Sequence, residues 1–272
     1  MSTRLRVGLS TCPNDTYAFC GLLEGEVRAE GLQLDFELAD VQALNEGLAA
    51  GHFDVVKASF AAALDHARDW VVLPVGAALG FGVGPLVVGA PRARRAPPRV
   101  LCPGRDTTAT LLWNFYGDPD AHVEQVVFSA ILPAVARGEA DLGVCIHEGR
   151  FTYRAHGLEL VEDLGERWER DTGAPLPLGG ILARSSLAPT VRAAFTRALA
   201  ESLAFADAHP ERALAVMRRH AREHDDAALW KHVELYVNAE TRGLSQTGRR
   251  ALATFAERAQ GGAGPPLAVD PL

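Results

Sequence analysis

Two stretches of the chain repeat one pattern, and this repeat restricts the possible folds more than any other feature of the sequence. NEGLAAGHFDVVKASF (45–60) and LPAVARGEADLGVCIHEGRF (132–151) both read as a helix, a glycine, an acidic residue, an apolar strand and a polar strand end. The corresponding positions are Gly51 with Gly138 and Asp54 with Asp141. Because glycines commonly end helices, and alternating helices and strands form parallel sheets, the repeat predicts two α/β units of similar construction.

The remaining pattern extends this expectation to the whole chain. Strand-like and helix-like segments alternate up to a strand over 178–182, and residues 189–260 have a helical period with a break at His209-Pro210. We expect an α/β fold with mixed, mostly parallel sheets, flanking helices and a helical C-terminus. The length suits one large domain or about two ordinary ones. The tail over 261–272, rich in glycine and proline, is expected to be disordered or loosely attached.

This arrangement resembles the two-lobe architecture of type II periplasmic binding proteins. We expect a discontinuous first lobe from residues 1–90 and 185–272, and a second lobe from residues 91–184. The stretch APRARRAPPR (90–99) reads as an exposed crossover between them. Ligands of open α/β sheets bind beyond the carboxyl ends of the strands. The polar ends of the two repeats are therefore expected to face each other across one cleft, which would hold the active site.

The end of the second repeat contains the best candidate for proton transfer. His147 follows an apolar strand, and a histidine can take or give a proton near neutral pH. The residues alone leave two interpretations open, a general base and a structural histidine. Cys145 lies two residues earlier on the same side of an extended strand. A cysteine–histidine nucleophile pair is therefore conceivable, but Cys145 reads as a core residue.

Other polar residues mark candidate binding positions. Thr107 and Thr108 precede a helix whose unpaired N–H groups could bind an anion, although helix capping by Asp106 or Thr107 explains the same residues. Asn14 follows the first strand in a similar way. Lys57 ends a buried strand, so its ammonium must reach solvent, a partner or a ligand. A surface lysine with a buried stem is the alternative.

One short motif suggests a metal site. HAREH (220–224) matches the H-x-x-E-H pattern of some zinc peptidases, with His220, Glu223 and His224 as candidates. Two aspartates follow at once, so the helix is expected to end there, and the chain offers no third ligand in a defined setting. We expect an exposed, charged helix and no metal.

The charge and the apolar content argue against several classes of protein. The net charge is −7 with interspersed signs, so neither nucleic acid nor an anionic membrane is expected as the main partner. No secretory signal pattern is found, and no segment approaches the ~20 apolar residues that cross a bilayer. The four cysteines are widely spaced and form no C-x-x-C pair, so we expect free thiols in a cytoplasmic protein.

Five stretches between residues 10 and 181 carry a family resemblance: STCPNDTYAF (10–19), VVKASF (55–60), GRDTTATLLW (104–113), CIHEGRFTY (145–153) and PLPLGGI (175–181). CIHEGRFTY with PLPLGGI is the specific combination. Together the stretches resemble the 1,4-dihydroxy-6-naphthoate synthases of the futalosine route to menaquinone. The chain has Thr11, Tyr17 and Ala58 where that family often has Pro, Phe, and Val or Leu, which affects the fine shape of the pocket.

The resemblance implies a lyase with a two-lobe fold. It makes His147 the catalytic base, and it implies substrate contacts at Lys57, Ala58, Ser59, Thr107, Thr108, Ala109 and Asn14. The implied reaction removes a proton from cyclic dehypoxanthinylfutalosine and breaks a carbon–carbon bond. The ring aromatises to 1,4-dihydroxy-6-naphthoate and dihydroxyacetone leaves, without a redox cofactor. The small-molecule substrate carries a carboxylate, which the helix start at the two threonines could hold.

Two alternatives remain at this stage. One is a non-catalytic cytosolic solute-binding or sensor protein on the same scaffold, and the other is the related chorismate dehydratase. The sequence assigns no roles to Glu148 and Arg150, and it does not specify the oligomeric state.

Overall fold

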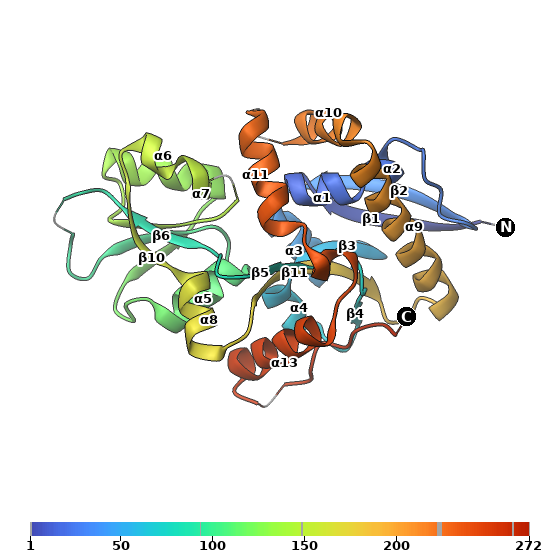
Figure 1. The fold of residues 1–272 in the computed structure, drawn as a ribbon. Helices are drawn as coiled ribbons and strands as arrows, with labels where there is room; N and C mark the ends of the chain where they lie inside the picture. Colours follow the sequence, from blue (N-terminus) through green and yellow to red (C-terminus); the bar gives the residue numbers. More distant parts are fainter. Residues whose placement is uncertain (1, 93, 148, 222–224, 263, 272) are drawn as a thin grey trace. The chain divides into compact units, whose positions relative to one another are not determined.

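The computed structural model describes residues 2–92, 94–147, 149–221, 225–262 and 264–271, and it divides into two compact units. Unit 1 comprises Met1–Leu79 and Pro177–Leu272, and unit 2 comprises Gly80–Leu176. Each unit contains its own mixed β-sheet, so the predicted α/β class is confirmed. Figure 1 shows the two units as a ribbon.

The sheet of unit 1 has the strand order β2-β1-β3-β11-β4, and β5 pairs with β11 off this path. β1 is parallel to both β2 and β3, whereas β11 is antiparallel to β3 and β4. The strands are β1 (Thr3–Ser10), β2 (Leu32–Ala39), β3 (Val55–Ser59), β4 (Trp70–Val72), β5 (Ala78–Gly80) and β11 (Leu176–Arg184).

The sheet of unit 2 has the strand order β10-β6-β9-β7-β8. β7 is parallel to β8 and β9, whereas β6 is antiparallel to β9 and β10. The strands are β6 (Leu86–Gly89), β7 (Arg99–Cys102), β8 (His122–Gln125), β9 (Leu142–Cys145) and β10 (Glu159–Asp163). In both sheets three parallel strands are followed by an antiparallel one, so β3 and β9, the strands of the two sequence repeats, occupy equivalent places.

The repeated glycines have the same conformational role in both units. Gly51 comes shortly after helix α3 (Val41–Ala49), and Gly138 caps helix α6 (Phe128–Arg137). Their φ angles are 66° and 83°, in the left-handed region that favours glycine. Each glycine thus ends its helix and redirects the chain into the next strand.

The repeated aspartates also have matching contacts. Oδ2 of Asp54 accepts a hydrogen bond of 2.8 Å from the backbone N–H of Arg6 in β1. Oδ2 of Asp141 accepts one of 2.9 Å from the backbone N–H of Arg99 in β7. The side chains therefore join the start of β3 to β1 and the start of β9 to β7, which gives the sequence repeat a structural reason.

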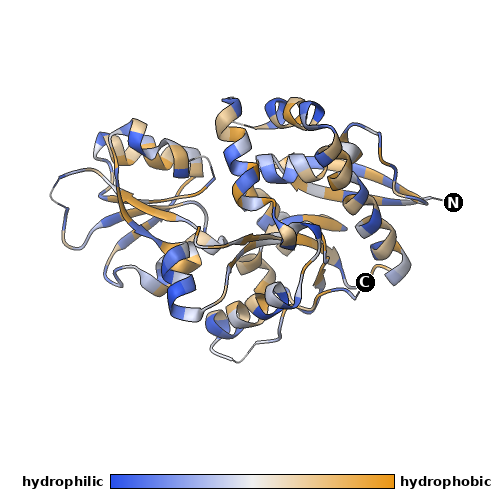
Figure 2. Cartoon of the chain, in the orientation of Figure 1, coloured by the Kyte–Doolittle hydropathy of each residue, from blue (hydrophilic) through white to orange (hydrophobic). Residues whose placement is uncertain are grey.

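Helices cover the sheets, and Figure 2 shows both hydropathy colours along most of them, as expected for helices with one packed face. The other helices of unit 1 are α1 (Pro13–Ala18), α2 (Cys20–Leu23), α4 (Phe60–Asp65), α9 (Pro189–Ala208), α10 (Pro210–His220), α11 (Asp226–Tyr236), α12 (Ala239–Arg242) and α13 (Gln246–Gln260). The other helices of unit 2 are α5 (Thr108–Tyr116), α7 (Gly149–Thr152), α8 (Leu164–Thr172) and the 3-10 helix η1 (Tyr153–His156). The predicted break at His209-Pro210 is confirmed, because Pro210 opens α10.

Each unit packs its own hydrophobic core. In unit 1, Phe19, Phe195 and Leu199 are among the fully buried side chains, and in unit 2 Ile131 and Val135 are. Burying a side chain of this size contributes roughly 1.5–3 kcal/mol relative to exposure. Among the described residues, none of the helices has the length and apolar character that a bilayer crossing requires.

The expectation for the C-terminal tail was wrong. Val72 in β4 donates its N–H to the carbonyl of Ala268, and Asp270 donates its N–H back to the carbonyl of Val72. Asp270 also forms an ion pair of 2.9 Å with Arg192, and Leu267 is buried. Glycine and proline suggested a loose tail, but paired backbone and a buried apolar side chain fix this segment.

The chain passes between the units within β5 and β11, at Leu79–Gly80 and Leu176–Pro177. The stretch 90–99, which we expected to be the crossover, lies within unit 2 instead. Its arginines have partners there, because Arg92 donates to the carbonyl of Val135, and Arg95 forms an ion pair with Asp141.

Candidate active site

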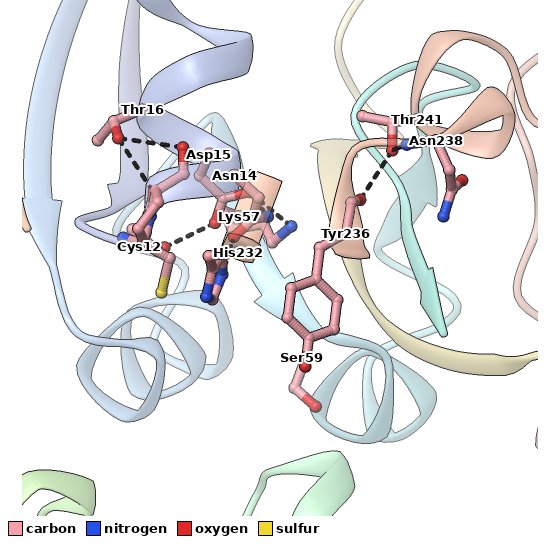
Figure 3. A network of polar contacts seen from close by, with 12 residues as sticks. Cys12, Asn14, Asp15, Thr16, Lys57, Ser59, His232, Tyr236, Asn238 and Thr241 are labelled. Atoms are coloured by element: carbon pink, nitrogen blue, oxygen red, sulfur yellow. Dashed lines mark hydrogen bonds and ion pairs between the residues drawn. The ribbon is translucent and has the colours of Figure 1, made fainter. Parts of the chain in front are cut away.

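Lys57 is a buried cation in the middle of β3, so the expectation that it ends its strand was wrong. All five residues of this strand are buried, and Lys57 is only 6% exposed. Its Nζ atom lies 2.8 Å from Oδ1 of Asp15 (Figure 3). A surface lysine with a buried stem is therefore excluded, since the ammonium itself lies inside the protein.

Asp15 is the centre of this polar network. Its Oδ2 atom accepts a hydrogen bond of 2.6 Å from Ser10, and its Oδ1 atom accepts one of 2.9 Å from the side-chain amide of Asn14. Ser10 ends β1, whose neighbour in the sheet is β3, so the carboxyl ends of the two strands lie side by side. This adjacency brings Asp15, in the helix after β1, to Lys57 in β3.

Asn14 connects the network to a residue that the sequence did not indicate. Nε2 of His232 lies 2.9 Å from Oδ1 of Asn14. Because the amide nitrogen of Asn14 donates to Asp15, its oxygen faces the imidazole, and Nε2 is the nitrogen that carries hydrogen. His232 is 2% exposed, and its ring packs against Tyr236 with centroids 4.7 Å apart. Figure 3 shows these side chains in one cluster of unit 1.

Ser59 and Ala58 complete the end of β3. Oγ of Ser59 accepts a hydrogen bond from the N–H of Ala61 and so caps α4. The backbone N–H of Ser59 donates to Oδ1 of Asn45. Ala58 is fully buried and faces Gly180 of β11. Ser59 lies two residues after Lys57, so both side chains project from the same face of the strand.

The threonines of unit 2 form the start of α5. Thr107 caps the helix, because its Oγ1 atom accepts a hydrogen bond from the N–H of Thr110. The same hydroxyl donates to the carbonyl of Gly104, so the capping alternative is structurally correct for Thr107. Thr108 and Ala109 form the first turn and are buried. The helix has nine residues and follows the loop after β7.

His147 lies just beyond β9 in a strained backbone conformation. Its φ angle is 53°, and it is the only non-glycine residue with a positive φ among the described parts of the chain. Such a conformation costs of order 1–3 kcal/mol and is typical of functional sites. The half-buried ring packs edge-on against Phe128, with centroids 4.9 Å apart.

The neighbouring thiol is not an activated nucleophile. Cys145 is buried, and burial raises the pKa of its thiol to about 12. A thiol with this pKa is almost entirely protonated near neutral pH, whereas the thiolate is the reactive form. Burial of the Cys145 thiol therefore argues against a Cys145–His147 nucleophile pair.

Arg150 anchors the loop that carries His147. One guanidinium nitrogen donates to the carbonyl of Gly84 at 2.7 Å, and the other lies 2.6 Å from Oδ2 of Asp163. The backbone N–H of Arg150 also donates to the carbonyl of His147. Arg150 is thus part of the support of this turn. Glu148 lies outside the described residues.

Each unit collects its candidate residues at one edge of its sheet. In unit 1, Asn14 and Lys57 share one hydrogen-bonded network through Asp15. In unit 2, β7 and β9 are parallel neighbours, so the loop that leads to Thr108 and the turn at His147 follow the same edge. This edge is the usual place of ligands in open α/β sheets.

The described residues contain no group of three or more histidine, cysteine or carboxylate side chains that could hold a metal ion. His220 ends α10, and burial lowers the pKa of its imidazole. Glu223 and His224 of the H-x-x-E-H match lie outside the described residues.

Comparison with known proteins identifies the family to which the chain is similar. A family model described as menaquinone biosynthesis matches residues 5–261. The chain is 46% identical over 255 residues to the 1,4-dihydroxy-6-naphthoate synthase of Thermus thermophilus, covering 93% of each protein. It is 38% identical over 261 residues to the enzyme of the same name from Streptomyces coelicolor, covering 94% of this chain and 92% of that one.

Solved structures agree with the fold. Protein AF1704 from Archaeoglobus fulgidus superposes with a TM-score of 0.88 at 30% identity, covering 95% of this chain and 98% of that one. The CA3427 gene product of Candida albicans, described as having the generic periplasmic binding protein fold, gives 0.69 at 13% identity, covering 97% and 92%. The predicted binding-protein-like architecture is thereby confirmed. The chain belongs to the family of 1,4-dihydroxy-6-naphthoate synthases, enzymes of menaquinone biosynthesis.

Proposed function

We propose that this chain is a lyase of the futalosine route, which converts cyclic dehypoxanthinylfutalosine to 1,4-dihydroxy-6-naphthoate and dihydroxyacetone. In this reaction a base removes a proton, a carbon–carbon bond breaks, and the new ring becomes aromatic. No net oxidation or reduction occurs, so proton transfer by the chain's own residues is sufficient. The observation that supports this function best is the strained position of His147 at the carboxyl end of β9.

His147 acts as the general base in this proposal. A base needs access to the substrate and must tolerate a change of charge, and the half-buried imidazole meets both requirements. Its backbone is held in the left-handed region by a turn that Arg150 supports through Asp163 and Gly84. A base held in one orientation has less to reorganise when the proton moves.

The start of α5 binds the substrate's carboxylate. Helix N-termini attract anions through unpaired N–H groups and the helix dipole, and threonine hydroxyls can add further donors. Thr108 and Ala109 occupy the first turn, and Thr107 shapes it as the cap. These residues follow the same sheet edge as His147, which suits a substrate held close to its base.

Asn14, Lys57, Ala58 and Ser59 of unit 1 are further substrate contacts in this proposal. Asn14 and Lys57 meet at one carboxylate, and Ser59 projects from the same face as Lys57. Both clusters lie at carboxyl ends of equivalent strands, where this architecture places ligands.

The decisive experiment is incubation of the purified protein with cyclic dehypoxanthinylfutalosine, followed by detection of the naphthoate by its absorbance and mass. Substrate that binds but remains intact would support a sensor protein on the same scaffold. Dehydration of chorismate instead would support the chorismate dehydratase alternative. Appearance of naphthoate together with dihydroxyacetone in equal amounts is the expected result.

A further inference from the structure

The buried ammonium of Lys57 has Asp15 as its counter-ion but no second described acceptor. Its Nζ atom lies 2.8 Å from Oδ1 of Asp15, a distance typical of a charge-assisted hydrogen bond, and no other described residue accepts a hydrogen bond from it. An ammonium has three N–H donors, and leaving buried donors unpaired is costly. These donors are therefore suited to an oxygen atom of a bound ligand.

The charge around Lys57 decides which kind of oxygen binds. The positive charge of Lys57 is balanced by the carboxylate of Asp15, and the side chains of Ser10 and Asn14 that contact this carboxylate are uncharged. A ligand carboxylate at Nζ would also lie near Asp15, and the repulsion between two buried carboxylates would offset much of its attraction to the ammonium. An uncharged hydroxyl or carbonyl oxygen accepts the same hydrogen bonds without adding charge to a buried site.

Ser59 adds a hydroxyl on the same face of β3. It is 3% exposed and lies two residues after Lys57 in an extended strand. An ammonium and a hydroxyl on one face match a ligand group that carries more than one oxygen.

We infer that Lys57 and Ser59 bind an uncharged, oxygen-bearing part of the substrate, and that Asp15 is the positioning residue that keeps this site electrically neutral. The identity of the substrate rests on the proposed function. Asn14 and His232 contribute by holding Asp15, since the Asn14 amide donates to Asp15 and its oxygen pairs with His232. The substrate carboxylate then binds at the start of α5 and not at Lys57.

The first test separates the two ends of the ligand. 2-Naphthoate has the ring system and the carboxylate of the proposed product but neither hydroxyl group, and its inhibition constant can be measured against turnover. In Lys57→Met this constant should stay within about twofold of wild type, while kcat/KM for the substrate falls roughly ten- to hundredfold, as for a lost hydrogen bond to a charged group. Thr108→Val is the matched control, and it should weaken 2-naphthoate.

Two outcomes of that test would overturn the inference. One is a loss of 2-naphthoate affinity of about tenfold or more in Lys57→Met, because Lys57 would then bind the carboxylate. The other is an unchanged kcat/KM in Lys57→Met, because Lys57 would then contact no part of the substrate.

The second test concerns Asp15 and requires no turnover. In Asp15→Asn the ammonium loses its counter-ion, so a small anion should bind in its place and stabilise the folded protein. Replacing chloride by formate at constant ionic strength should raise the melting temperature of Asp15→Asn more than that of wild type. Asp15→Asn/Lys57→Met, which removes both charges, should lose this extra response. Equal responses in all three proteins would contradict the assigned role of Asp15.

The double variant also covers the case in which Asp15→Asn does not fold. Because it buries no charge, it should fold and keep the wild-type affinity for 2-naphthoate, and a weakened affinity would contradict the inference. A wild-type protein without turnover would instead refute the proposed function. The formate comparison would still report on Lys57 and Asp15 in that case.

Discussion

β3 and β9 occupy equivalent places in their sheets, but the polar side chains near their carboxyl ends differ in burial and in backbone conformation. β3 continues two residues beyond Lys57 and enters α4 at once, and Lys57 is buried and neutralised by Asp15. Beyond β9 the chain forms a turn, and His147 is half-buried with a left-handed backbone. The first arrangement is buried and electrically neutral, and the second is strained and partly exposed.

The difference corresponds to two kinds of task. A group that only binds can be buried, provided that its charge is compensated and its orientation is fixed. A group that gains and loses a proton changes its charge, and full burial would penalise the charged form. In our proposal the repeated architecture therefore provides a binding edge in unit 1 and a proton-transfer edge in unit 2.

The largest expected effect comes from removing the imidazole at the β9 end. His147→Ala should lower kcat about 10²–10⁴-fold, the usual contribution of a general base, which is about 3–5 kcal/mol of activation free energy. The melting temperature should change little, since the ring is only half-buried. Steady-state kinetics with the proposed substrate measures the effect. A variant with nearly full activity would remove the functional contrast between the two strand ends.

The support of the His147 turn can be broken separately. Arg150→Met leaves the carboxylate of Asp163 buried without its cation, since only 4% of that side chain is exposed. Breaking such a pair costs about 3–5 kcal/mol, so urea unfolding should shift to lower concentration. Arg150→Met/Asp163→Asn is the control, and it should recover part of the loss. Similar stability of the single variant and wild type would show that the ion pair does not hold the turn.

The hydroxyl groups of Ser59 and Thr108 should affect substrate binding more than the rate of the chemical step. Ser59→Ala and Thr108→Val each remove one neutral hydrogen-bonding group, so KM should rise roughly two- to tenfold with a small change in kcat. Initial-rate kinetics would separate the two parameters. A covalent substrate adduct on either hydroxyl, detected by mass spectrometry, would mean that these residues react.

The backbone strain at His147 predicts a difference in stability between two variants, which can be measured without an activity assay. His147→Gly should be more stable than His147→Ala by about 1 kcal/mol, because glycine adopts a positive φ without steric cost. Ala61→Gly in α4 is the control, and it should destabilise the protein, since that residue is helical. Chemical denaturation of the two His147 variants tests this, and a more stable alanine variant would show that the backbone there is not left-handed.

The smallest expected effect concerns the thiol before the turn. Burial raises the pKa of Cys145 to about 12, so at pH 8 this group is a protonated thiol and not a thiolate. Iodoacetamide at pH 8 should leave Cys145 unmodified in the folded protein and label it after unfolding. Peptide mass spectrometry would detect the label. Rapid labelling of the native protein, accompanied by loss of activity, would restore the nucleophile alternative.

The sequence predicted the features that depend on local pattern. Gly51 and Gly138 end helices, and apolar runs predicted the strand before His147 and a strand at Lys57, which continues through Ser59. These predictions succeeded because periodicity and helix-ending glycines act over a few residues.

Features that depend on distant pairing could not be predicted in this way. Asp15 meets Lys57 only because β1 and β3 are neighbours, and His232 reaches Asn14 from a helix near the other end of the chain. Nothing in the residues around His232 indicates such a partner. The prediction for the C-terminal tail was wrong for the same reason, because the partners of the tail, Val72 and Arg192, are far away in sequence.

The position of β11 has a consequence for the order in which the protein folds during synthesis. β11 lies between β3 and β4, and Ala268 and Asp270 pair with Val72. Unit 2 is continuous and is complete once Leu176 has left the ribosome, so it can fold while the rest of the chain is still being made. The sheet of unit 1 cannot be completed by β1 to β3 alone, because β11 is synthesised only after unit 2. Pairing β3 with β11 closes a loop that contains all of unit 2, and forming such a long-range contact is slow. Until then the edge of β3 that pairs with β11 is unpaired, and unpaired strand edges favour association with other chains.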